Sequence, residues 1–216
     1  SEMCIRDSNN YVIAITRTCG SGATSISRIL GERLGINVYD RNLLRLASDD
    51  SGINEELFAR ADEHMKQSLL YRISKKVYNG EIIPPDSNDF TSNDNLFNYQ
   101  AKVLKELAAN ESFICIGRAA DYILKDNPNL ITIFICAPMD KCIKREMELL
   151  SFDAKKAEQH IITTDKYRAG FYKYHTGREW KNPENYDLCL NTGKFDYETC
   201  VDIIENYIKT RLAGNN

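Results

Sequence analysis

Residues 11–34 read YVIAITRTCGSGATSISRILGERL, and this stretch decides the fold. Its first six residues form a continuous run rich in β-branched and other apolar side chains. Such a run is typical of a strand buried on both faces of a parallel sheet. After a glycine turn, Ile26, Leu30 and Leu34 recur at helical spacing, and the glycine that follows them is a common helix stop. A strand, a glycine turn and a helix in this order predict the first unit of an α/β sheet.

The turn between this strand and this helix, residues 17–25 (RTCGSGATS), is called the glycine loop below. Gly20 and Gly22 allow backbone N–H groups to approach a ligand with no side chain in between. The helix that follows directs the positive end of its dipole and its unpaired N–H groups at the same place. These features favour a phosphate site.

Two positions of the glycine loop depart from the phosphate-binding pattern GxxxxGK[ST]. Arg17 stands where the pattern has its first glycine, and Ala23 stands where it has its lysine. Thr24 keeps the place of the hydroxyl that contacts Mg²⁺. From the loop alone, a phosphate site and an ordinary turn of small residues both remain open.

The rest of the chain alternates apolar runs with helical patterns. Further strands are predicted at 36–39, 113–116, 130–136 and 186–190, and helices at 41–48, 54–78, from 100 to 108, after Pro138, at 153–174 and at 197–212. This order predicts an α/β fold, a doubly wound sheet of about five parallel strands flanked by helices. We expect residues 11–213 to form a single domain, with a helical and polar insertion at 54–97. Residues 1–10 are polar and unpatterned, and we expect them to be a disordered, non-native leader.

Composition narrows the class of protein. The net charge of −3 argues against nucleic-acid or anionic-membrane binding by bulk charge, and 43% hydrophobic residues suit a globular protein. No apolar run reaches the length of a membrane span. The seven cysteines include no CxxC pair and the three histidines have no ligand spacing, so we expect reduced cysteines and no metal or catalytic histidine. These features indicate a cytoplasmic protein.

Polar residues follow the predicted strands. Arg17 follows the first strand, Asp40 the second, and the sequence GRAAD, with Arg118 and Asp121, the third. Ligands of doubly wound sheets bind at the carboxyl ends of the strands. Arg118 and Asp121 would suit a fork that grips an anionic substrate. A helix-capping turn with an internal ion pair is the alternative.

The helix predicted from residue 153 carries charges on its apolar stripe. Beyond Ile161 the stripe continues through Asp165 and Arg168. Charges are costly to bury unpaired, so this end of the helix is expected to face a polar cleft. Residues 153–182 would then form a mobile basic lid. In the alternative, the helix leaves the core after Ile161 and its charges are solvated. On the preceding helix, Arg145 is the basic residue retained as a site candidate.

Taken together, the chain resembles the cytidylate-kinase-like family of phosphotransferases from residue 11 to about residue 212. The segments that carry the resemblance are ITRTCGSGATSISRIL, VYDRNLL, FICIGRAADYIL, IFICAPMDKCIKR, TDKYRAGFYKY and YDLCLNT. The resemblance implies a P-loop kinase-like fold with a helical lid. A lysine-less GSG loop is shared with the looser members of this group.

The resemblance also implies roles for individual residues. The donor nucleotide would be bound by Arg17, Gly20, Ser21, Gly22, Ala23, Thr24 and Ser25, with Thr24 placing Mg²⁺. The acceptor would be bound by Asp40, Arg41, Arg45, Arg118 and Asp121. Arg118, Arg145, Arg168 and Asp165 would act in catalysis. Arg17 or a lid arginine would stand in for the missing lysine.

Two functions follow as hypotheses. The first is an ATP- and Mg²⁺-dependent kinase that transfers the γ-phosphoryl group to CMP, dCMP or a similar small acceptor, by positioning and positive charge. The second is a nucleotide-binding protein that has lost this activity and serves as a sensor or partner-binding module. An α/β protein without a nucleotide is a third reading. The expected partners are small nucleotides, not nucleic acid or membrane, and self-association is left open.

Overall fold

The structure is a computed structural model and describes residues 10–40, 73 and 93–214. Its strands are β1 (Val12–Arg17), β2 (Asn37–Tyr39), β3 (Phe113–Ile116), β4 (Leu130–Cys136) and β5 (Leu188–Asn191). Its helices are α1 (Ala23–Leu34), α5 (Asn93–Asn110), α6 (Ala120–Ile123), α7 (Met139–Leu150), α8 (Ala154–Thr176), the 3₁₀ turn η2 (Pro183–Asn185) and α9 (Tyr197–Ala213).

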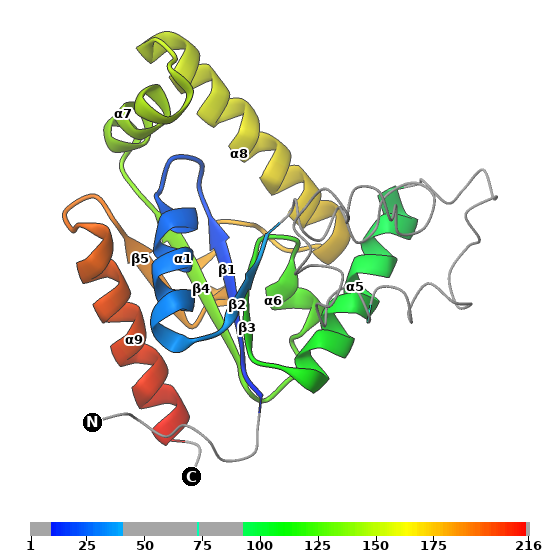
Figure 1. Cartoon of the computed structure of the whole chain (residues 1–216). Helices are drawn as coiled ribbons and strands as arrows, with labels where there is room; N and C mark the ends of the chain where they lie inside the picture. Colours follow the sequence, from blue (N-terminus) through cyan, green and yellow to red (C-terminus); the bar gives the residue numbers. More distant parts are fainter. Residues whose placement is uncertain (1–9, 41–72, 74–92, 215–216) are drawn as a thin grey trace, which may run out of the picture. The chain divides into compact units, whose positions relative to one another are not determined.

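The five strands form one sheet in the order β2-β3-β1-β4-β5 (Figure 1). β1 pairs in parallel with β3 and with β4, and β4 pairs in parallel with β5. The central strands are buried along nearly their whole length, as the continuous apolar runs predict. The predicted α/β fold with about five parallel strands is confirmed, and so are the predicted bounds of β3 and β4.

Two compact units divide the chain. Of the described residues, 12–38 and 113–214 belong to one unit, which holds nearly all of the sheet. Residues 10–11, 39–40, 73 and 93–112 belong to the other. The predicted helix at 41–48, most of the predicted insertion at 54–97, and the leader except Asn10 lie outside the described residues, so the domain boundaries stay a prediction.

Helix α1 begins and ends at glycines. Gly22 and Gly35 occupy its two cap positions in the left-handed region, with φ of 83° and 64°. The prediction that Gly35 ends this helix is confirmed. Helix α1 packs against α9, and α7 pairs with α8. In the described ranges, no helix combines the length and apolarity that crossing a bilayer requires.

Two predicted boundaries are wrong. β5 begins at Leu188, not Tyr186, because Tyr186 ends the turn η2, where its N–H donates to the carbonyl of Pro183 at 3.1 Å. Helix α5 begins at Asn93, whereas a loop was predicted up to residue 97. Asparagine and aspartate are common at helix starts, and there the polar sequence was mistaken for loop.

Candidate functional site

The glycine loop connects β1 to α1 at the carboxyl edge of the sheet. Gly20 and Gly22 both have positive φ, 74° and 83°. Gly22 is the N-cap of α1 and no side chain caps the helix there. The first N–H groups of an α-helix have no partner within the helix, so an uncapped start offers them to an anion.

Two hydroxyls of the glycine loop also favour an anion site at this place. Thr18 Oγ1 and Ser21 Oγ are buried and make no hydrogen bond to any described residue. A buried polar atom without a partner costs free energy, and such atoms are uncommon in folded proteins. A bound phosphate group would give these hydroxyls acceptors. The residues of the loop therefore fit the phosphate chain of a nucleotide.

The two glycines are also required by packing. A Cβ on Gly20 would lie 2.8 Å from the backbone of Cys142 in α7, and a Cβ on Gly22 would lie 2.4 Å from the ring of Tyr197 in α9. From the sequence, these glycines are expected only to let a ligand approach the loop backbone. In the structure, α7 and α9 also pack closely against the two glycines, which restricts the path of the loop backbone.

Arg145 of α7 holds the glycine loop from within the protein. Its NH1 group donates to the carbonyl oxygens of Ser21 at 2.9 Å and Gly20 at 3.3 Å, and to Thr192 Oγ1 at 2.9 Å. Its NH2 group donates to the Thr192 carbonyl at 3.3 Å, and Thr192 Oγ1 in turn donates to the Ser21 carbonyl at 2.7 Å. In this structure Arg145 therefore donates to the loop backbone and to Thr192, which itself donates to the loop. A direct role on a transferred phosphoryl group stays a prediction.

Two arginines lie close together at the start of the glycine loop. Arg168 of α8 donates to the Arg17 carbonyl oxygen at 3.3 Å, and its NH1 lies 3.8 Å from Asp165 Oδ1. Burial, and after it the like charge of Arg168, lowers the pKa of Arg17 to about 10. Both groups are still cations at neutral pH. Two neighbouring cations in a partly buried place are relieved by an anion bound between them.

Asp165 contacts the loop itself. Its Oδ1 accepts the N–H of Cys19 at 2.8 Å. Burial raises the pKa of Asp165, while the Cys19 amide and then Arg168 act in the opposite direction. Asp165 therefore positions the loop against α8, as an acceptor for one of its amides.

Helix α8 reaches from the glycine loop to the turn after β3 (Figure 1). Past Asp165 and Arg168, the ring of Phe171 lies 5.0 Å from the Arg118 guanidinium carbon, and the Tyr172 hydroxyl donates to Asp121 Oδ2 at 2.6 Å. The contacts recur every three or four residues, so one face of α8 carries all of them.

The turn after β3 has an uncommon backbone. Gly117, Arg118 and Ala119 all have positive φ, at 75°, 61° and 54°. Non-glycine residues in this region are strained, and such strain is concentrated at functional sites. A Cβ on Gly117 would lie 2.6 Å from Arg17 NH1. The turn thus lies directly beside the first arginine of the glycine loop.

Asp121 follows this turn and is 4% exposed. Its Oδ1 is buried with no hydrogen-bond partner among the described residues. Burial raises the pKa of this carboxyl, and the hydrogen bond from Tyr172 partly offsets that effect. Among the described residues, Asp121 pairs with Tyr172 and not with Arg118, so the alternative of an internal ion pair in this turn is not seen.

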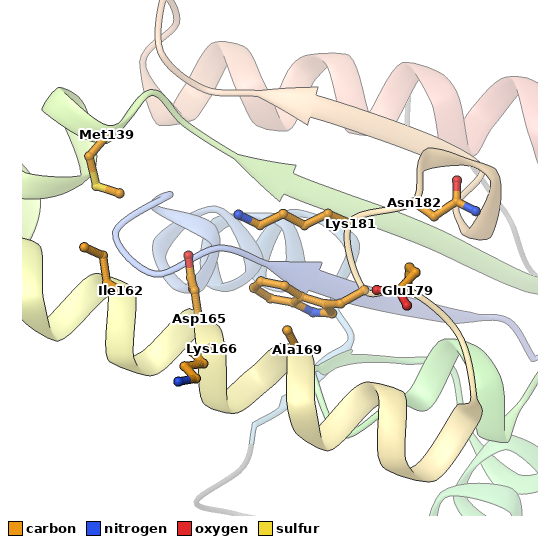
Figure 2. A pocket seen from close by; sticks show the side chains of 9 residues that line it. Met139, Ile162, Asp165, Lys166, Ala169, Glu179, Lys181 and Asn182 are labelled. Atoms are coloured by element: carbon orange, nitrogen blue, oxygen red, sulfur yellow. The ribbon is translucent and has the colours of Figure 1, made fainter.

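A cavity of about 470 Å³ lies between α8 and the segment before η2. Figure 2 shows Ile162, Asp165 and Ala169 along α8, with Lys181 across from them. Trp180 also lines the cavity and is itself 4% exposed. The cavity thus places an aromatic ring and a lysine next to the carboxylate that contacts the glycine loop.

The predicted site residues fall into three groups. The glycine loop, Arg145, Asp165, Arg168, Arg118 and Asp121 all lie in the unit that holds the sheet. Asp40 belongs to the other unit, and Arg41 and Arg45 lie outside the described residues. Thr192 and Tyr172 were not among the predicted site residues. Both carried a usable signal, because Thr192 directly follows β5 and Tyr172 continues the helical stripe of Asp165 and Arg168, but the sequence did not mark Tyr172 as the partner of Asp121.

Comparison with known proteins assigns the chain to a family. The sequence model described as the cytidylate kinase-like family matches residues 12–194. A cytidylate kinase from Fervidobacterium nodosum is 22% identical over 223 residues, covering 92% of this chain and 96% of that protein. A uronate isomerase from Corynebacterium glutamicum is 28% identical over 107 residues, and the match spans 20% of that longer protein.

Solved structures share the fold. A crystal structure of an uncharacterized protein from Eubacterium ventriosum has a TM-score of 0.69 and 28% identity, covering 93% of this chain and 99% of that one. A gluconokinase from Sinorhizobium meliloti has a TM-score of 0.52 at 14% identity, covering 97% of each chain. At 14% identity, the similarity to the gluconokinase supports a shared fold and says nothing about the substrate.

Proposed function

Since this chain belongs to the cytidylate kinase-like family, we propose that it transfers the γ-phosphoryl group of ATP to CMP, dCMP or a similar small acceptor. Family and fold indicate a nucleotide kinase. One observation carries the finer proposal: an uncapped helix start and two buried, unpartnered hydroxyls lie beside Arg17 and Arg168. The proposal includes a cytoplasmic location, where both nucleotides are available.

The donor phosphates are assigned to the glycine loop. The N–H groups at the start of α1 and the hydroxyls of Thr18 and Ser21 would bind phosphate oxygens. Thr24 is exposed in the first turn of α1, so its hydroxyl is available to Mg²⁺. When bound, Mg²⁺ would neutralise phosphate charge. Gly20, Gly22 and Ser25 would give the phosphates room and further N–H groups.

The missing lysine is compensated, in this proposal, by arginines. Ala23 is 2% exposed, so its side chain faces packed protein. Arg168 donates to the backbone carbonyl of Arg17, and its charge is close enough to lower the pKa of Arg17. A guanidinium presents a planar fork that matches phosphate oxygens. Arg168 would therefore stabilise the transferring group, and Arg17 would hold the donor phosphates.

The acceptor is assigned to the turn after β3. Asp121 Oδ1 is a buried acceptor without a partner among the described residues, which suits an amino group such as that of cytosine. The Arg118 guanidinium suits the phosphate of a nucleoside monophosphate. Asp40, Arg41 and Arg45 stay proposed contributors on the acceptor side.

A phosphotransfer assay tests the proposal. ATP and Mg²⁺ are supplied with CMP, dCMP, UMP, AMP or shikimate, and product is separated by chromatography. We expect turnover of CMP or dCMP that falls about 10²–10³-fold in Arg168→Gln, as for the loss of one electrostatic group. Arg28→Gln is the matched control, because Arg28 is an exposed arginine on α1 that lines a separate surface pocket with Gly35 and Asn37. Turnover of none of the nucleotides would refute the proposal.

A further inference from the structure

Three metal-binding side chains from separate elements converge beside the glycine loop. They are Cys19 of the loop, Glu146 of α7 and His160 of α8. One ligand atom of each, a sulfur, a carboxylate oxygen and an imidazole nitrogen, lies within 4.8 Å of the other two. We propose that this cluster binds a divalent transition-metal ion such as Zn²⁺ and thereby links the loop to α7 and α8.

The set of donor atoms determines the class of metal. Thiolate sulfur and imidazole nitrogen bind Zn²⁺ and similar ions well, whereas Mg²⁺ prefers oxygen ligands only. This site is therefore different in kind from the Mg²⁺ that would accompany a nucleotide at Thr24. It also stands whether or not the proposed kinase activity is correct.

The geometry is close to that of a bound site. Glu146 Oε2 lies 3.7 Å from His160 Nε2. In a tetrahedral zinc site with bonds of about 2.0–2.3 Å, neighbouring ligand atoms are about 3.3–3.6 Å apart. With all three ligand atoms within 4.8 Å of one another, the cluster needs its side chains to move inward by up to about 1.5 Å. Three protein ligands would leave the fourth position to water.

Burial and access fit the same assignment. Cys19 is 6% exposed and Glu146 is 7% exposed, while the His160 side chain is 41% exposed. A buried carboxylate needs a cation or hydrogen bonds to offset its lost hydration, and the His160 imidazole at 3.7 Å supplies that charge only when it is protonated. A metal ion would supply that charge. The exposed His160 provides the side from which the ion enters.

Metal binding would release one proton and change no oxidation state. The Cys19 thiol would lose its proton to solvent as the metal–sulfur bond forms, and the imidazole would bind through a neutral nitrogen. Because Cys19 also donates its N–H to Asp165, the ion would fix α8 where Arg168 lies beside the loop. Metal occupancy would therefore influence the part of α8 that faces the glycine loop.

Titration of the full chain with Co²⁺ tests this assignment. Tetrahedral Co²⁺ bound to a thiolate gives a sulfur-to-metal charge-transfer band together with visible ligand-field bands. We expect one equivalent of Co²⁺ to produce both, and Zn²⁺ to bleach both by displacement. Cys19→Ser should abolish the charge-transfer band, and His160→Gln should weaken Co²⁺ binding at least tenfold.

Matched variants identify the ligands. Cys189 is an exposed cysteine and His175 is another histidine of α8, so Cys189→Ser and His175→Gln should leave the spectrum unchanged. A charge-transfer band that survives Cys19→Ser but vanishes in Cys142→Ser would overturn the assignment, as would wild-type protein that gives no thiolate band. If Cys19→Ser does not fold, His160→Gln decides, because this side chain is partly exposed; unchanged Co²⁺ affinity there would refute the site.

Discussion

Replacing Arg145 by methionine tests whether this residue supports the glycine loop or acts on the substrate. Methionine keeps much of the length of the side chain and removes all of its donors. The two bonds at 2.9 Å, to Ser21 O and Thr192 Oγ1, are the strong ones, whereas the two at 3.3 Å are at the long end. Hydrogen bonds from charged groups contribute about 1.5–3 kcal/mol each, and the site is half-buried, so we expect a loss of about 2–4 kcal/mol.

Urea unfolding and thermal melting measure this loss. For a chain of this size, about 3 kcal/mol corresponds to a fall in Tm of about 6–12 °C. ATP affinity should fall as well, because the loop carbonyls lose their anchor. Thr192→Val is the companion variant, and its effect should be less than additive with Arg145→Met, since both act on Ser21. A variant with unchanged Tm but a large loss of kcat would refute the supporting role and favour direct catalysis.

Two further predictions concern a buried carboxyl and a tight turn. Burial raises the pKa of Asp121 above 3.8, so the native state holds this proton more tightly than the unfolded chain, and stability is lost as pH rises through the raised pKa. The free energy of unfolding of Asp121→Asn, relative to wild type, should therefore increase between pH 4.5 and 7.5 in urea melts; a difference that does not vary with pH would contradict this. Gly22→Ala and Gly35→Ala both place a side chain at positive φ, at a cost of about 1–2 kcal/mol. Only the first also meets the Tyr197 ring, at 2.4 Å, so it should lose more stability in the same melts and should also lose ATP affinity; equal losses would refute the packing argument.

The sheet could be predicted because its strands are continuous apolar runs. β3 and β4 are buried on both faces, so nearly every residue is apolar and the runs end where the strands end. β5 was harder, because Tyr186 is apolar enough to read as strand while its backbone ends the turn η2. These strands are predictable because they are buried on both faces, and runs of apolar residues in a sequence indicate burial.

Residues of the site could be predicted only where a local sequence pattern, such as helical spacing, identified them. Helical spacing along α8 placed Asp165 and Arg168 on the apolar stripe where it continues beyond Ile161, and both contact the glycine loop. The hydrogen bonds from Arg145 to Gly20 and Ser21 join residues more than a hundred positions apart, so its helix revealed a charged face but not its partners. The cluster of Cys19, Glu146 and His160 has no spacing signature for the same reason, since three elements supply one ligand each.

The central claim is that the glycine loop binds the phosphates of a nucleotide although it has no lysine. Calorimetric titration of the full chain with ATP and, separately, with adenosine, both with Mg²⁺, tests it most directly. We expect ATP to bind at least tenfold more tightly than adenosine, and we expect Arg168→Gln to remove most of that preference while Arg28→Gln keeps it. Equal binding of ATP and adenosine by the wild-type protein, or no binding of ATP, would contradict the account.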